Sequence, residues 1–321
     1  MAKNTLLALL LIIISGVILI HCTNDKAGTS DTTTNDDSLQ QSIAHGAYLV
    51  NNVAACVDCH SKRDFKYFAG PVVPGSEGMG GEPLDNKLMH GIPGVLYPKN
   101  ITPDSSTGIG GWTDEELIRA ITIGINKKGD TLFPLMPYPA YNRLPKQDIL
   151  DIIAYLRTIK PINNPVPERK LFIPINTAYP PNLQAVTDNN VRPAETDRVK
   201  YGEYLVTMAD CRTCHTPMNE RGQQGEAFTG GMTFNTPAFT VTSANITPDS
   251  LTGIGAWTEK MFIEKFKTYR NEEGYLYDPG KQNTIMPWTF FAKMKDEDLK
   301  AIYAYLRTLK PANNKIEKWK M

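Results

Sequence analysis

The sequence predicts an all-α fold built as two similar domains in tandem. Apolar residues recur at i, i+3, i+4 and i+7 in segments 149–156 and 299–306, and this spacing gives a helix one apolar face. Sustained alternation of apolar and polar residues, the pattern of a half-buried strand, is absent from the 321-residue chain. The third observation is a duplicated segment, which predicts that one structural unit occurs twice.

The duplicated segment is 14 residues long and lies at 100–113 and again at 245–258. Its two copies differ at only two positions, Ser106/Leu251 and Gly111/Ala256. Shorter matches flank it in the same order and pair 46–50 with 202–206, and 154–158 with 304–308. Two units are too few for a solenoid, so the repeat predicts two domains of the same construction.

The N-terminal segment 1–21 is interpreted as an export signal or membrane anchor. The weakly polar to apolar run 5–20 covers 16 residues, which is short for a membrane-spanning helix of about 20 residues and typical of a signal core. Cys22 follows directly, as in a bacterial lipoprotein signal, although His21 replaces the usual small residue. A lipidated Cys22, an uncleaved anchor and a soluble secreted form all place the remainder outside the cytoplasm, on the periplasmic side.

Composition predicts the other boundaries. The predicted parts are a polar tether at 22–41, a first domain at 42–160, a proline-rich linker at 161–199, a second domain at 200–312 and a tail at 313–321. Seven prolines stiffen the linker. Its apolar stretch 171–175 is expected either to pack along one domain or to serve as a docking strip. Because 34 basic residues balance 34 acidic ones, nothing indicates binding to nucleic acid.

Within each domain the helices begin and end at recognisable signals. The Gly-x-Tyr segments at 46–48 and 202–204 are interpreted as first helices. Thr113 and Glu116 form a predicted capping box, and Thr258 keeps the cap without the glutamate. The last helix of each domain is expected to stop before a proline.

Two copies of Cys-x-x-Cys-His carry the chemistry. This spacing is typical of c-type haem attachment, in which both thiols form thioethers with the haem and the histidine ligates the iron. The residues concerned are Cys56, Cys59 and His60 in the first domain and Cys211, Cys214 and His215 in the second. The sequence therefore predicts two covalently attached haems c.

Zinc and disulfide chemistry are the alternatives for these cysteines. Four thiolates can hold one zinc ion, but that site would leave both histidines unexplained and would join pairs more than 150 residues apart. A thioredoxin-like redox pair is expected near a βαβ pattern, which the chain lacks. Haem attachment accounts for all six residues.

Met136 and Met286 are the predicted second axial ligands. Each precedes a proline, and each lies 19 residues before the tyrosine of its last helix, Tyr155 or Tyr305. Core packing is the usual role of a methionine, but the recurrence favours ligation. Because histidine and methionine would then fill both axial positions of each iron, the pattern predicts an electron carrier and not an enzyme.

The duplicated segment is interpreted as the wall of a haem crevice. Trp112 and Trp257 offer an indole N–H to a haem propionate, and Asn100 and Asn245 are further candidate crevice residues. The alternative is a tight loop that ends in a core tryptophan.

Residues 42–312 resemble the multihaem class I cytochromes c that accept electrons from periplasmic dehydrogenases, such as the cytochrome subunits of alcohol and gluconate dehydrogenases. The resemblance implies two class I domains with long haem-crevice loops. It also implies that the first and last helices of each domain cross where Gly46 and Gly202 allow close approach. Only 11 residues follow Lys310, so a third haem domain is not expected.

The predicted function is electron transfer outside the cytoplasmic membrane. The expected partners are a dehydrogenase or quinol donor and a cytochrome or oxidase acceptor, with membrane attachment through the N-terminal lipid or anchor. The alternative function is a dihaem peroxidase, in which one iron opens its sixth coordination position to substrate. That alternative requires unlike halves, whereas both halves here have the same ligand pattern.

Overall fold

The computed structural model describes residues 30–179, 182–219 and 224–319. The predicted signal segment and Cys22 lie outside the described residues. We call residues 42–160 the first half and residues 200–312 the second half. Within the described residues, no helix is both long and apolar enough to cross a membrane.

In the first half, the helix α2 (Cys56–Cys59) carries both cysteines of the first Cys-x-x-Cys-His motif. The helices of this half, in chain order, are α1 (Ser30–Tyr48), the π-helical turn η1 (Leu49–Val53), α2, α3 (Asp114–Ile123), α4 (Tyr138–Tyr141) and α5 (Lys146–Leu156). Because α1 begins at Ser30, residues 30–41 of the expected tether are helical. A helix needs only its own backbone hydrogen bonds, so it can continue into a segment of polar composition.

The second half repeats this order. Its helices are α7 (Arg198–Met208), α8 (Cys211–Cys214), α9 (Glu259–Lys267), η2 (Glu272–Gly274), η3 (Gly280–Gln282), α10 (Trp288–Phe291) and α11 (Asp296–Leu306). The short helix α6 (Ile175–Ala178) lies in the linker. The predicted capping box at Thr113 and the cap at Thr258 are both confirmed.

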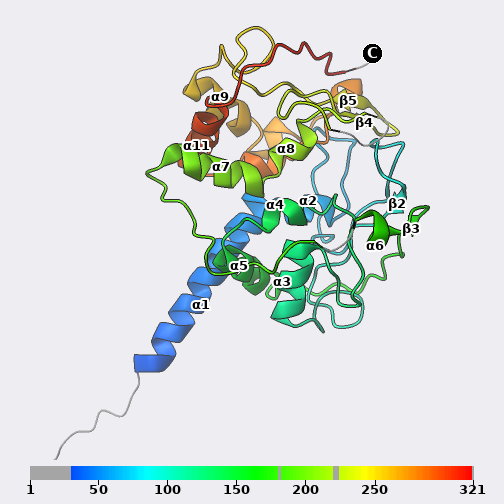
Figure 1. The fold of residues 1–321 in the computed structure, drawn as a ribbon, viewed down its shortest axis with the longest axis vertical. Coiled ribbons are helices and arrows are strands. Elements are labelled where there is room, and N and C mark those ends of the chain that lie inside the picture. Colours follow the sequence, from blue (N-terminus) through cyan, green and yellow to red (C-terminus); the bar gives the residue numbers. More distant parts are fainter. Residues whose placement is uncertain (1–29, 180–181, 220–223, 320–321) are drawn as a thin grey trace, which may run out of the picture. The chain divides into compact units, whose positions relative to one another are not determined.

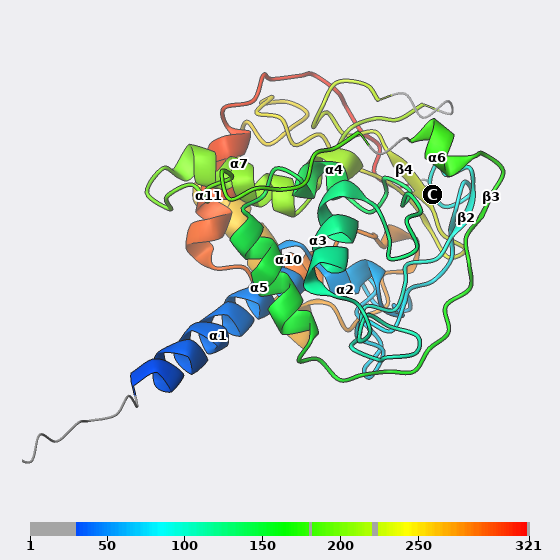
Figure 2. The same ribbon diagram turned by 60° about the horizontal axis from the view of Figure 1, so that its bottom comes forward.

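First and last helices cross where the resemblance predicted. A Cβ at Gly46 would lie 1.8 Å from the carbonyl oxygen of Asp151, and one at Gly202 would lie 1.9 Å from that of Ala301. Figures 1 and 2 show α7 lying against α11 in the second half. In both halves, glycine is therefore the residue that lets the two backbones meet.

The structure also contains two small antiparallel sheets, so the expectation of no sheet was wrong. One joins β1 (Leu84–Asp85), β2 (Gly94–Leu96) and β3 (Lys170–Leu171), and the other joins β4 (Thr233–Asn235) to β5 (Thr240–Thr242). Strands of two or three residues are too short to show alternation. They form by hydrogen bonding between the backbones of loops. Because every residue has these backbone groups, such pairing gives no recognisable sequence pattern.

The linker packs along the first half. Its strand β3 pairs with β2, and Asn190 donates to the carbonyl oxygens of Asn142 and Leu144 at 3.1 and 3.2 Å. The tail is also bound, because the indole N–H of Trp319 donates to the carbonyl oxygen of Asn283 at 2.9 Å. Both segments therefore belong to the folded unit.

The largest apolar cluster crosses from one half to the other. Buried side chains of α5 and η1 join those of α7 and α11 in one cluster, which includes Leu49, Ile149, Leu205 and Leu299. Figure 1 shows α4 of the first half next to α7 of the second. The two halves therefore share a packed interface, in contrast to domains joined only by a linker.

Candidate haem-attachment sites

Each Cys-x-x-Cys motif forms a single helical turn, α2 or α8. The first cysteine begins the turn, and the histidine caps it by donating its backbone N–H to the first cysteine's carbonyl oxygen, at 3.1 Å for His60 and 3.0 Å for His215. Residues at i, i+3 and i+4 share one face of a helical turn. The local fold therefore brings both thiols and the imidazole of each motif to one side.

Both histidines are oriented by a backbone carbonyl. The Nδ1 atom of His60 lies 2.6 Å from the carbonyl oxygen of Lys99, and that of His215 lies 2.7 Å from the carbonyl oxygen of Ala244. Because a carbonyl can only accept, Nδ1 is the donor, and the lone pair of the neutral ring is on Nε2. This is the tautomer that ligates a metal through Nε2.

The four motif cysteines differ in exposure. Cys59 and Cys214 are exposed and Cys56 and Cys211 are half-buried, and none of the four is in a disulfide. Burial nevertheless raises the pKa of Cys56, Cys59 and Cys211 to about 12. This environment disfavours a charged thiolate and suits an uncharged thioether. The residues therefore fit covalently attached haem.

The two predicted methionine ligands lie in matching turns. Met136 and Met286 are half-buried against the shared core. In each turn the second residue after the methionine donates its N–H to the methionine carbonyl oxygen at 2.7 Å, Tyr138 in the first half and Trp288 in the second. The intervening prolines have similar backbone angles, with φ −78° and ψ 41° at position 137 and φ −73° and ψ 54° at position 287.

Asn100 and Asn245 fasten the duplicated segment to the chain beyond the last helix. Each is 3% exposed. The Nδ2 group of Asn100 donates to the carbonyl oxygen of Ile162 at 2.8 Å, and its Oδ1 accepts from the backbone N–H of Thr102 at 2.9 Å. Asn245 makes the equivalent bonds in the second half. Both amides are engaged by the protein, so they maintain the shape of the segment.

Trp112 and Trp257 lie against the shared core and are half-buried. No hydrogen bond from either indole N–H to another described residue is found. The predicted contact between each indole N–H and a haem propionate stays a prediction.

The chain is similar along most of its length to cytochrome subunits of dehydrogenases. Residues 199–310 match the family model of cytochrome c. These residues form a cytochrome c domain.

Three relatives extend the likeness to the rest of the chain. The cytochrome c subunit of alcohol dehydrogenase (quinone) from Gluconacetobacter polyoxogenes is 29% identical over 299 residues, covering 89% of this chain and 59% of the relative. The gluconate 2-dehydrogenase cytochrome c subunit of Pantoea cypripedii is 27% identical over 309 residues, covering 91% and 64%. A diheme cytochrome c-type protein of Cereibacter sphaeroides is 29% identical over 266 residues, covering 78% and 81%.

The chain thus spans about three-fifths of the length of the two dehydrogenase subunits. A cytochrome c domain implies covalently bound haem c, and residues 199–310 include the second Cys-x-x-Cys-His motif. The relatives are named as cytochrome subunits, and the expectation that this chain carries electrons and is not itself a catalytic enzyme agrees with those names.

The two motifs affect each other's pKa values. Burial is the main cause of the raised pKa of Cys214, and the charges of Asp210 and then of Cys59, from the other motif, add to it. Asp210 in turn contributes to the raised pKa of Cys59. The two Cys-x-x-Cys-His motifs are therefore near enough to influence each other's titration.

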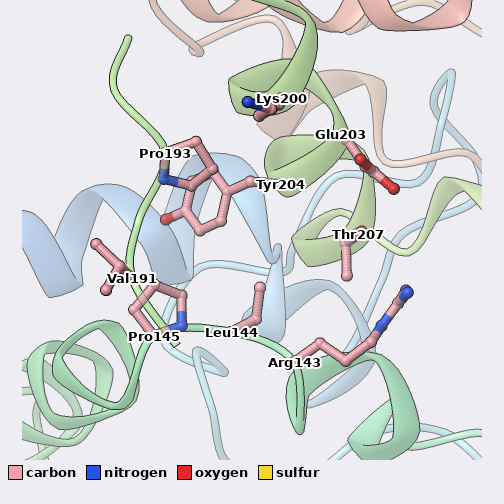
Figure 3. Close-up of a pocket in the computed structure, with 9 residues that line it drawn as sticks. All are labelled: Arg143, Leu144, Pro145, Val191, Pro193, Lys200, Glu203, Tyr204 and Thr207. Atoms are coloured by element: carbon pink, nitrogen blue, oxygen red, sulfur yellow. The ribbon is translucent and has the colours of Figure 1, made fainter. Parts of the chain in front are cut away.

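A surface pocket of about 250 Å³ lies between the halves but contains no residue of either motif. Figure 3 shows Arg143, Leu144 and Pro145 on one side and Lys200, Glu203 and Tyr204 of α7 on the other. Its lining mixes apolar residues such as Leu144 and Val191 with charged ones such as Arg143 and Lys200, and neither the cysteines nor the histidines of the two motifs reach it. We therefore assign this pocket no role in haem binding.

His45, Asp148 and Asp151 also form a cluster whose geometry could hold a metal ion. Asp148, however, is paired with the guanidinium of Arg192 and accepts from the hydroxyl of Tyr204 at 2.8 Å. The guanidinium of Arg192 therefore already supplies the positive charge that a metal ion would bring to Asp148. We interpret the cluster as an ion-pair network at the interface between the two halves.

The carbonyls of Lys99 and Ala244 were missed by the sequence analysis. A backbone acceptor has no residue-type signature, because every residue has a carbonyl. The available signal was position, since each of these residues directly precedes a copy of the duplicated segment.

Proposed function

We propose that the chain is a dihaem c-type cytochrome that transfers electrons outside the cytoplasmic membrane, from a dehydrogenase or quinol donor toward a terminal acceptor. The observation that carries this proposal is the Nδ1–carbonyl bond made by both His60 and His215. A preoriented Nε2 beside two thiols is the arrangement that a covalently attached haem requires. Its repetition supports one haem c in each half, and two tandem class I domains.

The side chains of the two motifs have defined roles in this proposal. When bound, haem c supplies one-electron exchange at its iron. The thiols would hold it covalently, and each histidine Nε2 and each methionine Sδ would ligate its iron. In chain order the residues are Cys56, Cys59, His60 and Met136, then Cys211, Cys214, His215 and Met286.

Filled axial positions explain why the chain would act as a carrier. A thioether sulfur is a soft ligand that favours Fe(II), so methionine raises the reduction potential. With both positions taken by side chains, peroxide and oxygen have no coordination position. The methionine turns begin the short helices α4 and α10, and rigid turns limit ligand movement between oxidation states.

The duplicated segments provide the crevice walls. The indole N–H groups of Trp112 and Trp257 are proposed donors to a propionate. The fully engaged amides of Asn100 and Asn245 hold the segment in shape, and the carbonyls just before them orient His60 and His215.

The partner and the location follow from the relatives and from the N-terminus. Relatives named as cytochrome subunits of dehydrogenases support a dehydrogenase as the donor. The predicted export segment 1–21 supports a position on the periplasmic side, with attachment to the membrane through lipid on Cys22 or through an uncleaved anchor.

Substitution of the methionines tests the proposal. Met136→Ala and Met286→Ala are each expected to make one of the two haems high-spin and to lower its potential by on the order of 0.1 V, within the ~0.8 V range that axial ligands cover. The measurements are the absorption spectrum and a potentiometric titration of the haem-loaded protein.

Met261→Ala is the matched control, because Met261 is 49% exposed on α9 and should leave both haems unchanged. Native spectra and potentials in both Met136→Ala and Met286→Ala would show that neither methionine is a ligand. A haem that reacts with peroxide in the unmodified protein would instead support the peroxidase alternative.

A further inference from the structure

The segment after the first Cys-x-x-Cys-His motif differs from its counterpart in the second half. Arg63 lies three residues after His60, whereas the third residue after His215 is Met218. The x-x pair also differs, because Asp58 corresponds to Thr213. The first half therefore carries an ionic pair, Asp58–Arg63, at two positions where the second half has the uncharged residues Thr213 and Met218.

Arg63 is buried and fully engaged. Its side chain is 9% exposed, and its Nη1 lies 2.8 Å from the carboxylate of Asp58, which is 7% exposed. Its other guanidinium nitrogens donate to the carbonyl oxygens of Gly70 and Ala69. Nη1 also donates to the carbonyl oxygen of Ile285 at 3.4 Å. The planar guanidinium of arginine has several N–H donors and suits this role, because the ammonium group of a lysine could not reach all of these acceptors at once.

Ile285 directly precedes Met286, so this contact links the first motif to the methionine turn of the second half. Asn283, which is 1% exposed, makes a second link. Its Oδ1 accepts from the N–H of Ala69 at 2.8 Å, and its Nδ2 donates to the carbonyl oxygens of Phe65 and Tyr67 at 2.9 and 3.1 Å.

The link continues to Met286 itself. The Oδ1 of Asn283 also accepts from the N–H of Thr284 at 2.8 Å, and the hydroxyl of Thr284 accepts from the N–H of Met286 at 3.1 Å. In the first half, by contrast, the N–H of Met136 donates to the carbonyl oxygen of Phe133 in its own loop at 3.1 Å. The two methionine turns are therefore supported differently.

We propose that Arg63 and Asn283 are positioning residues through which the first half holds Met286 in place to ligate the second haem. This inference rests on the proposed function, since it assumes that Met286 is an axial ligand. The physical reason is that a buried, hydrogen-bonded turn fixes the position of the methionine sulfur, whereas a loosened turn weakens its bond to the iron. The two haems then differ in potential because only one depends on the other half.

The test replaces the pair by the residues of the second copy. Arg63→Met alone leaves Asp58 buried without a partner, so the double variant Asp58→Thr/Arg63→Met is the main one. The haem-loaded protein is expected to lose methionine-to-iron charge-transfer absorption from one haem and to keep it at the other. A tenfold loss in the preference of methionine for Fe(II) lowers that haem's potential by about 59 mV.

Further variants assign the effect. Asn283→Asp keeps the acceptor for Ala69 and Thr284 but loses both donated bonds, so it should produce the same change at the same haem. Adding Met136→Ala to the double variant should remove the remaining charge-transfer absorption, whereas adding Met286→Ala should change little. Arg63→Lys, made as a single substitution, should keep part of the charge-transfer absorption that the double variant loses. Lys62→Met, which removes an exposed charge one residue away, is the matched control.

The outcomes separate this inference from the proposed function. Unmodified protein without any charge-transfer absorption would contradict methionine ligation itself. If the unmodified protein has it and folded double variants, checked by circular dichroism, keep it at both haems or lose it equally at both, the positioning role is wrong. Loss at the Met286 haem alone, with both haems still covalently bound, supports it.

Discussion

Asp151 is an example of a single buried residue that ties α1 to the rest of the first half. It accepts hydrogen bonds from the hydroxyl of Ser42 at 2.5 Å, from Nδ1 of His45 at 2.7 Å and from Nε2 of Gln147 at 2.8 Å. Burial acts to raise its pKa, but the three hydrogen bonds outweigh burial and lower it below the ordinary value. The ionised form is therefore favoured by folding.

This shift predicts an acid-dependent contribution to stability. A carboxyl group whose pKa is lowered in the folded state stabilises above the unfolded pKa near 3.8, and the contribution is lost as the pH falls through the lower folded value. Asp151→Asn is expected to lower the free energy of unfolding by about 1–3 kcal/mol at pH 6. The difference in the free energy of unfolding between the variant and the unmodified protein should shrink as the pH falls below about 4.

Denaturant unfolding between pH 3 and 6 measures this difference, with exposed Asp37→Asn as the control. A deficit that stays constant down to pH 3 would show that the charge of Asp151 does not carry the effect.

At the scale of residues, the sequence predicted the groups that have a chemical signature. Repeated cysteines, histidines and methionines can be recognised by residue type and spacing, and equivalent residues of the two halves lie in matching turns. Arg63 and Asn283 were not predicted, because their partners lie more than 200 positions away in the chain. Ordinary residue types acquire such roles only through tertiary packing.

At the scale of elements, the crossing of α7 and α11 depends on one glycine. A Cβ at Gly202 would lie 1.9 Å from the carbonyl oxygen of Ala301 and 2.9 Å from the Cβ of Tyr305. Neither neighbour is the far end of a flexible side chain, so the helices would have to separate. Separation would open the apolar core that both halves share.

Gly202→Ala is therefore predicted to destabilise the protein by about 3 kcal/mol, measured by thermal or denaturant unfolding. Gly111→Ala is the matched control, because a Cβ there would meet only the carbonyl oxygen of Ser105, at 3.7 Å, and the second copy already has Ala256 at this position. Equal stability of the two variants would contradict the close-crossing account.

Helices were predictable and the small sheets were not. The periodic segments 149–156 and 299–306 lie within α5 and α11, and the capping box begins α3 as expected. Strands such as β1 and β3 have two residues each, which is below the length at which a pattern can be recognised. The pairing of the linker with β2 depends on the fold of the first half, so composition alone could not reveal it.

At the scale of the whole molecule, the two halves are joined by reciprocal hydrogen bonds. Tyr48 of the first helix donates to Asp298 in the last helix of the other half, and Tyr204 donates to Asp148 in the opposite direction. Equivalent residues thus exchange partners, as at a two-fold symmetric interface. Duplication accounts for the arrangement, because one self-complementary surface occurs twice in one chain.

This interface explains why the two attachment turns lie near each other. Charges of one motif affect the thiols of the other, and the loop after the first motif supports the turn that carries Met286. The sequence predicted two repeated units but could not predict their mutual orientation. That orientation is determined by which faces the two copies bury together.

The absorption spectrum of the oxidised, haem-loaded protein, recorded before and after addition of peroxide, tests the central claim most directly. The proposed function predicts two covalent low-spin haems per chain, a methionine-to-iron charge-transfer band and no response to peroxide. A single haem, a high-spin component or a haem that reacts with peroxide would contradict the account of a dihaem carrier with both axial positions filled.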